Sequence, residues 1–288
     1  MNSDQIDGGW SGDGAAVRSN SYDVSSIGGG VDAETLRLAA QVDLFWEKER
    51  RLYASRGLEV ARRVVELGCG PGFVLRHMAE AFPDVELHGL EVDPVLVERA
   101  KMLFAGESLD IVVRQASIFD TGYEDATFDF VLVRLVLEHL SDPARALQEV
   151  FRIVRPGGQV VVIDNDFEMH LMASPPVPEL REVYDAYCKA REEEGGNPLI
   201  GRDLPILLHE AGFVDIDYEI VAAHSAVVGD EIFSRSEGVS IPSRLVREGY
   251  LSSVALGNLS RRWRDVVRNP RHAQIRQLHV GAGRRPSI

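Results

Sequence analysis

The segment Val64-Val65-Glu66-Leu67-Gly68-Cys69-Gly70-Pro71-Gly72 constrains the fold of this chain more than any other stretch. A β-branched apolar pair leads into an acidic residue and then into three glycines spaced two apart. Because glycine has no Cβ, such a turn lets a ligand approach the backbone closely. Apolar residues at helical spacing follow between positions 73 and 81. The segment therefore predicts a buried strand, a glycine turn and a helix.

Two ligand classes fit a glycine turn at the carboxyl end of a parallel strand: dinucleotides and S-adenosylmethionine. The dinucleotide fingerprint needs glycines at its first, third and sixth positions. Counted from Gly68, the sixth position is Phe73, and the last glycine falls one residue early, at Gly72. Glu66, just before the turn, would face a cationic group more readily than a diphosphate. The pattern favours S-adenosylmethionine, and an NAD-dependent oxidoreductase is the disfavoured alternative.

Four further motifs follow the glycine turn in order. They are an apolar strand ending in an acid, a second apolar strand, a Glu-His loop and a Pro-Gly-Gly turn into a third strand, at 87–94, 127–133, 137–143 and 153–162. With the first motif, they resemble class I S-adenosylmethionine-dependent methyltransferases, of the type 11/25-like kind that acts on small molecules. The resemblance covers roughly residues 35 to 225, and its final strand extends to the C-terminus.

The resemblance implies an α/β fold, a Rossmann-like, doubly wound and mostly parallel seven-stranded sheet with an antiparallel last strand. The apolar patterns predict strands near 62–67, 86–91, 110–115, 128–133, 158–164, 214–223 and 274–281, with helices between them. We expect five segments: a leader or lid at 1–31, a cap helix at 32–58 with Asp32 as N-cap, a core at 59–228, a helical insertion at 229–273, and the final strand at 274–288.

The resemblance also assigns residues to the cofactor. Glu66 is expected near the amino group of the methionine part, and Glu91 near the ribose hydroxyls. Ser117 stands where many relatives carry an aspartate for the adenine amino group, so either its hydroxyl, Asp120 or a backbone amide would serve that purpose. The other expected contacts are the turn residues Gly68, Cys69, Gly70 and Gly72, then Val92, Ile118 and the backbone carbonyl of Arg134.

Candidates for chemistry on the acceptor follow the fourth and fifth strands. His139 has an unperturbed pKa suited to a general base, although a histidine there can also simply order the loop. Asp166 lies in a polar loop that offers a second proton acceptor or only turn-forming side chains. We expect Tyr22, Trp46, Asn165 and His170 to contact the substrate.

Charge and cysteine content narrow the partners and the compartment. The net charge is −14, from 31 basic and 45 acidic side chains, which disfavours nucleic acid and anionic membrane. An arginine run at 261–264 is expected on an amphipathic helix, or as a patch for an anionic substrate. Two widely spaced cysteines predict no metal site and a reducing, cytoplasmic location. An apolar face on the 32–56 helix would support a homodimer.

These expectations combine into one activity. The chain is expected to move a methyl group from S-adenosylmethionine to a small molecule, leaving S-adenosylhomocysteine, in natural-product or secondary metabolism. Oxygen is the first choice for the acceptor atom and carbon the second. Because the sulfonium methyl is already activated, positioning by in-line geometry would supply most of the catalysis. A catalytically silent cofactor-binding subunit is the other alternative.

Overall fold

A long antiparallel strand at the C-terminus organises one half of the sheet in the computed structural model, which describes residues 30–237 and 240–287. The sheet order is β3-β2-β1-β4-β5-β8-β6, and β7 pairs with the other edge of β8. Strands β1 to β5 are parallel, whereas β6 and β7 run antiparallel to β8. The strands are β1 (Arg63–Leu67), β2 (Glu86–Glu91), β3 (Ile111–Gln115), β4 (Phe128–Arg134), β5 (Val154–Asp164), β6 (Leu171–Ser174), β7 (Val214–His224) and β8 (Ala273–Arg284).

The expected fold class is confirmed, but the sheet has eight strands rather than seven. The extra strand is β6, which pairs with residues 273–276 of β8. At its other end β8 pairs with β5 through residues 279–284. Because β8 extends past the end of β5, its first residues would otherwise present an unpaired edge, and β6 covers it.

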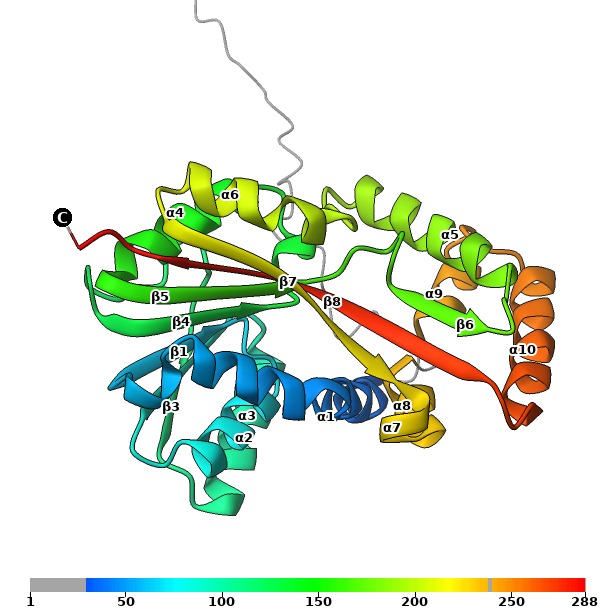
Figure 1. The fold of residues 1–288 in the computed structure, drawn as a ribbon, viewed down its shortest axis with the longest axis horizontal. Helices are drawn as coiled ribbons and strands as arrows, with labels where there is room; N and C mark the ends of the chain where they lie inside the picture. Colours follow the sequence, from blue (N-terminus) through cyan, green and yellow to red (C-terminus); the bar gives the residue numbers. More distant parts are fainter. Residues whose placement is uncertain (1–29, 238–239, 288) are drawn as a thin grey trace, which may run out of the picture.

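Helices cover both faces of the sheet, as Figure 1 shows. α1, α2 and α3 lie on one face, and α4, α5 and α6 lie on the other. The helices are α1 (Gly30–Ser55), α2 (Phe73–Ala81), α3 (Pro94–Glu107), α4 (Pro143–Ile153), α5 (Glu179–Glu193), α6 (Leu204–Glu210), α7 (Ser225–Val228), α8 (Asp230–Glu237), α9 (Ser240–Arg247) and α10 (Ser253–Arg268). None of the helices within the described residues has both the length and the apolar character needed to cross a membrane.

The central strands explain why the sheet is buried on both faces. Val64, Val65 and Leu67 of β1 are fully buried, and so are Phe130 to Val133 of β4. Such continuous apolar runs are typical of parallel strands covered by helices on both sides. The carboxyl ends of these strands lie together, and this shared edge is where the glycine turn is placed.

Helix α1 begins two residues earlier than expected. Asp32 is therefore inside its first turn instead of being the N-cap, and its carboxylate pairs with Arg99 of α3. Further along the helix, buried Glu49 forms an ion pair with Arg134 at the end of β4, with 3.0 Å between Glu49 Oε1 and Arg134 Nη2. This pair ties α1 to the carboxyl edge of the sheet.

The segment predicted as a helical insertion contains α8, α9 and α10. In Figure 1, α9 and α10 lie at the far end of the molecule beside β6. Val266 of α10 is buried, while Arg261, Arg262 and Arg264 are exposed, as expected for an amphipathic helix. The division of the chain into a core and an inserted cap stays a prediction.

Candidate active site

A cavity of about 580 Å³ lies at the carboxyl edge of the parallel strands. This volume is in the range of sites that enclose a small organic ligand. Twelve of the predicted site residues line it: Glu66, Gly68, Cys69, Gly70, Glu91, Val92, Ser117, Ile118, Arg134, His139, Asn165 and His170. Most of the residues expected at the cofactor and the acceptor therefore line the same cavity.

The glycine turn meets the cavity at two of its three glycines. Gly68 has φ +75°, and a Cβ there would lie 2.4 Å from Cγ2 of Val136. Gly70 has φ +52° and nothing within 4 Å of the place a Cβ would take, so its backbone is open to approach. Gly72 does not line the cavity; a Cβ there would lie 2.4 Å from the ring of Phe104. The structure gives Gly72 a packing role between α2 and α3.

Glu91 is held in place by three backbone amides. Its Oε1 accepts hydrogen bonds from the amides of Val92 (2.8 Å) and Asp93 (2.9 Å), and its Oε2 accepts one from Gly70 (2.9 Å). Oε1 already accepts two hydrogen bonds, whereas Oε2 accepts one and keeps acceptor capacity for a ribose hydroxyl. Asp93 caps α3, as predicted, by accepting from the amide of Val95 at 2.7 Å.

Glu66 is a buried carboxyl group that a positively charged ligand group would stabilise. It is 2 % exposed, and its Oε2 has no hydrogen-bond partner in the part of the chain that the structure describes. Burial raises the pKa of Glu66 well above its ordinary value, although nearby Arg134 acts to lower it. An ammonium group beside this carboxylate would offset the burial cost. The amino group of S-adenosylmethionine fits that requirement.

Arg134 lines the cavity, but its side chain turns away toward α1. Its Nε and Nη2 donate to the carboxylate of Glu49 at 3.0 Å, and the hydroxyl of Tyr53 donates to the same carboxylate at 3.0 Å. The residue that follows, Leu135, has φ +56°, an uncommon conformation for a non-glycine residue. The chain therefore turns sharply where it passes the methionine end of the expected cofactor.

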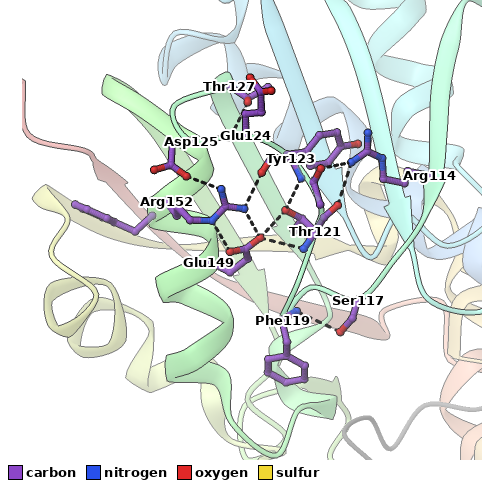
Figure 2. Close-up of polar contacts among 12 residues, drawn as sticks. Arg114, Ser117, Phe119, Thr121, Tyr123, Glu124, Asp125, Thr127, Glu149 and Arg152 are labelled. Atoms are coloured by element: carbon purple, nitrogen blue, oxygen red, sulfur yellow. Dashed lines mark hydrogen bonds and ion pairs between the residues drawn. The ribbon is translucent and has the colours of Figure 1, made fainter.

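The loop expected at the adenine is anchored by Glu149 and Arg152 of α4 and by Arg114 of β3, as Figure 2 shows. The hydroxyl and amide of Thr121 donate to Oε1 of Glu149 at 2.6 and 3.0 Å, and Arg152 binds the same carboxylate at 2.7 Å. Hydrogen bonding to Arg152 lowers the pKa of Glu149 to about 2. Arg114 donates to the carbonyl of Gly122 at 2.6 Å.

Within this anchored loop, Ser117 and Ile118 line the cavity. The hydroxyl oxygen of Ser117 accepts a hydrogen bond from the amide of Phe119 at 3.2 Å (Figure 2). Asp120 is exposed and does not line the cavity, so the structure does not bring this alternative adenine acceptor to the site. Ile118 is buried and offers the apolar surface expected against a flat ring.

His139 belongs to a series of buried polar side chains that contact one another. Its Nε2 lies 3.4 Å from Oε1 of Glu138. The same oxygen accepts a hydrogen bond from Nδ2 of Asn165 at 3.0 Å, and Oδ1 of Asn165 accepts one from Nη2 of Arg276 at 3.3 Å. Burial raises the pKa of Glu138, whereas burial and neighbouring arginines hold the pKa of His139 well below its ordinary value.

The series of buried polar contacts continues from Arg276 through Glu237 to a second histidine, His170. Nη1 of Arg276 lies 2.9 Å from Oε1 of Glu237, and Oε2 of Glu237 lies 3.3 Å from Nε2 of His170. Burial lowers the pKa of His170 to about 4, which keeps the ring neutral near neutral pH. The His170 ring stacks on Phe167 with 4.3 Å between centroids. Two neutral histidines thus line one wall of the cavity.

Two residues predicted at the acceptor are not brought to the site. Asp166 lies outside the cavity lining, and Arg202 binds its carboxylate with 2.6 Å between Nε and Oδ2. Trp46 also lies outside the lining, because its ring stacks on His77 at 4.9 Å. Adjacent helix positions face different directions, and only the face that carries Gln41 reaches the cavity. Tyr22 lies outside the described residues.

Sequence reasoning missed several charged residues of the cavity wall. Glu138 directly precedes His139 in the Glu-His loop at 137–143, and this position in the motif could have indicated that it lines the site. Arg276 of β8 and Glu237 of α8 line the cavity, but no local sequence motif identifies them as site residues. Among residues 30–237 and 240–287, no group of three or more His, Cys, Asp or Glu side chains is arranged to hold a metal ion. That expectation of no metal stays a prediction.

Comparison with known proteins assigns part of the chain to a protein family. Residues 65–162 match the family described as "Methyltransferase domain". The chain contains a class I S-adenosylmethionine-dependent methyltransferase domain. The matched residues include the glycine turn, Glu91, Ser117 and His139, the same segments that line the cavity.

Two curated relatives extend the match beyond this segment. An uncharacterized 37.1 kDa protein in transposon Tn4556 of Streptomyces fradiae is 32% identical over 70% of this chain and 56% of its own length. The ubiquinone/menaquinone biosynthesis C-methyltransferase UbiE of Desulfotalea psychrophila is 28% identical over 64% of this chain and 68% of its own length. The chain spans a little over half the length of the first curated relatives that it matches.

A solved structure with the same fold is the phosphoethanolamine N-methyltransferase 2 of Haemonchus contortus in complex with S-adenosyl-L-methionine. It is 17% identical, with a TM-score of 0.57, and the match covers 89% of this chain and 58% of that chain. At this identity the likeness establishes the fold of the methyltransferase domain and nothing about its substrate.

Proposed function

We propose that this protein is an S-adenosylmethionine-dependent methyltransferase that acts on a small-molecule acceptor. The observation that carries the proposal is the combination of a buried, unpartnered Glu66 oxygen, an open Gly70 backbone and an amide-oriented Glu91 around one end of the cavity. These groups fit, in order, an ammonium group, a close-lying methionine chain and a ribose diol. The other end of the same cavity holds the acceptor.

Bound S-adenosylmethionine supplies an activated methyl group on a sulfonium and leaves as S-adenosylhomocysteine. Glu66 and the turn residues hold the methionine part, Glu91 with Val92 orients the ribose, and Ser117 with Ile118 borders the adenine. The chain's own task is to fix donor and acceptor in line at near-attack distance and to exclude water. No metal takes part in this proposal.

Oxygen is the acceptor atom that the site supports best, and carbon is the second choice. The cavity wall carries two neutral histidines, His139 and His170, each able to accept a hydrogen bond from a hydroxyl group. Either ring could take up the hydroxyl proton as the methyl group is transferred. The name of the UbiE relative describes a C-methyltransferase, which keeps carbon in consideration.

A small molecule of natural-product or secondary metabolism suits a cavity of about 580 Å³, and a net charge of −14 disfavours nucleic acid and anionic membrane surfaces as substrates. A cytoplasmic location and a homodimer through α1 remain part of the proposal. The alternatives are a catalytically silent cofactor-binding subunit and, less favoured, an NAD-dependent oxidoreductase.

Calorimetric titration with S-adenosylmethionine and with NAD, followed by transfer of labelled methyl to a panel of phenols, catechols and quinols, tests this proposal. We expect micromolar binding of S-adenosylmethionine, none of NAD, and loss of at least tenfold in affinity for Glu91→Ala. Glu98→Ala, on the exposed side of α3, is the matched control. Binding without any transfer would favour the silent subunit; NAD binding alone would overturn the proposal.

A further inference from the structure

Five arginines from five different elements converge on the acceptor end of the cavity. They are Arg37 of α1, Arg191 of α5, Arg244 of α9, Arg264 of α10 and Arg276 of β8. The acidic side chains that line this end are Glu138, Glu194 and Glu237. The chain as a whole has a net charge of −14. Among the side chains that line this end, arginines therefore outnumber glutamates, although Glu34 and Glu248 outside the lining pair with Arg37 and Arg244.

Carboxylates pair with four of these five arginines. Glu34 binds Arg37 at 2.7 Å, Glu248 binds Arg244 at 2.7 Å, and Glu237 binds Arg276 at 2.9 Å. Glu194 accepts from Nη1 of Arg191 at 2.9 Å and also pairs with Arg244, so one lining carboxylate serves two guanidinium groups. Arg264 forms no hydrogen bond or ion pair with the residues that the structure describes. Nε of Arg276 is buried and has no hydrogen-bond partner among them.

The positive charge of this cavity end also acts on His139, which lines the same cavity. Arg191, Arg37 and Arg244 each lower the pKa of His139, in addition to its burial. Arg276 of β8 acts in turn on the carboxyl group of Glu138, which lies beside this ring. A field that disfavours an imidazolium ion favours an anion in the same space.

Apolar side chains complete this end of the cavity. Val183 and Tyr184 of α5, Leu245 of α9, and Leu256, Leu259 and Trp263 of α10 line it. Trp263 and Arg264 of α10 both line the cavity, so an apolar and a cationic side chain border the same space. A ligand that satisfies both surfaces has an apolar or aromatic body and a negatively charged group.

We propose that the acceptor is an amphipathic organic anion whose carboxylate, or an equivalent anionic oxygen, binds the arginines of this cavity end while its apolar body packs on α5, α9 and α10. The inference rests on the proposed function, because it names the class of acceptor for the same site. Bidentate binding by guanidinium groups suits a carboxylate well. The rival explanation is that these arginines only tie the helices together.

Two fluorescent probes with the same ring skeleton separate these explanations: anilinonaphthalenesulfonate, which is an anion, and N-phenylnaphthylamine, which is neutral. Each is titrated into the full chain with and without saturating S-adenosylhomocysteine, whose own binding is measured first by calorimetry. Failure of the proposed function therefore appears as absent cofactor binding, independently of the probe result. The variants are Arg264→Gln, Arg264→Lys and Arg268→Gln, the last lying on α10 outside the cavity.

We expect the anionic probe to bind the S-adenosylhomocysteine complex at least tenfold more tightly than the neutral probe. Arg264→Gln should weaken the anionic probe about fivefold and leave the neutral probe unchanged, Arg264→Lys should retain most of the affinity, and Arg268→Gln should have no effect. Equal affinity for both probes, binding of neither, or the same loss in Arg268→Gln as in Arg264→Gln would overturn the proposal.

Discussion

The two ends of the cavity are built in different ways. The cofactor end consists largely of backbone: glycines 68 and 70, and the amides that orient Glu91, all within segments close in sequence. The acceptor end consists of side chains from α1, α5, α8, α9, α10 and β8, brought together across long sequence separations. A backbone site can bind one shared cofactor whatever the surrounding side chains, whereas a side-chain site can be changed residue by residue to fit another acceptor.

The largest expected effect concerns the buried ion pair that ties α1 to the carboxyl edge of the sheet, beside the cofactor end. Glu49 and Arg134 are buried, so Glu49→Ala would leave a buried guanidinium without its carboxylate. We expect the free energy of unfolding to fall by about 3–5 kcal/mol, measured by urea denaturation. Glu47→Ala, whose exposed carboxylate pairs with Arg50, should change it by less than about 0.5 kcal/mol. Equal effects of the two variants would contradict the role given to the buried pair.

The next effect is on the glycine turn. In Gly68→Ala the new Cβ would lie 2.4 Å from Val136 in a backbone of positive φ. Strain of about 2 kcal/mol would raise the Kd for S-adenosylmethionine by about 30-fold, measured by calorimetry. Gly106→Ala, on α3 with nothing within 4 Å, should bind normally and gain up to about 1 kcal/mol of stability. Normal cofactor binding by Gly68→Ala would show that this turn does not shape the site.

Much of the cofactor end could be predicted from the sequence because its residues lie in short, contiguous motifs. Glu66, Gly70 and Glu91 line the cavity as expected, since a strand followed by a turn fixes their place. The acceptor end could not be predicted in the same way. The bond between Asn165 and Arg276 spans 111 residues, and no local pattern indicates such a contact. Trp46, expected at this end, stacks on His77 outside the cavity lining, because a helical pattern does not say which face meets a ligand.

A smaller, pH-dependent effect is expected under the adenine loop. Glu149→Gln removes a carboxylate that binds Arg152 and Thr121, and should cost about 1–2 kcal/mol at pH 7. Because the folded pKa of about 2 is below the usual value of 4.5, this stabilisation is full above pH 4.5 and is lost as the pH falls toward 2. Denaturation at several pH values should show the variant and the wild type converging over that range.

Glu124→Gln, an exposed change in the same loop, is the control for the pH series. It should stay within about 0.5 kcal/mol of the wild type at every pH. A gap between wild type and Glu149→Gln that stays constant from pH 7 to 3 would mean that the charge of Glu149 does not anchor the loop.

The smallest expected effect is that of an acceptor-end substitution on cofactor binding, and it tests whether the two ends of the cavity act independently. His170 contacts Phe167 and Glu237 at the acceptor end. His170→Gln should therefore change the Kd for S-adenosylmethionine by less than about twofold, measured by the same calorimetry, because distant sites behave independently. A tenfold weaker Kd would mean that the two ends are not separate.

Hydrogen–deuterium exchange with and without S-adenosylhomocysteine tests most directly whether the cofactor and the acceptor occupy opposite ends. We predict slower exchange in peptides covering 66–72, 91–96 and 116–119, with little change in peptides from α5 and α10. Slower exchange confined to α5 and α10, or none in the three cofactor peptides under saturating ligand, would contradict the assignment of the glycine turn to the cofactor.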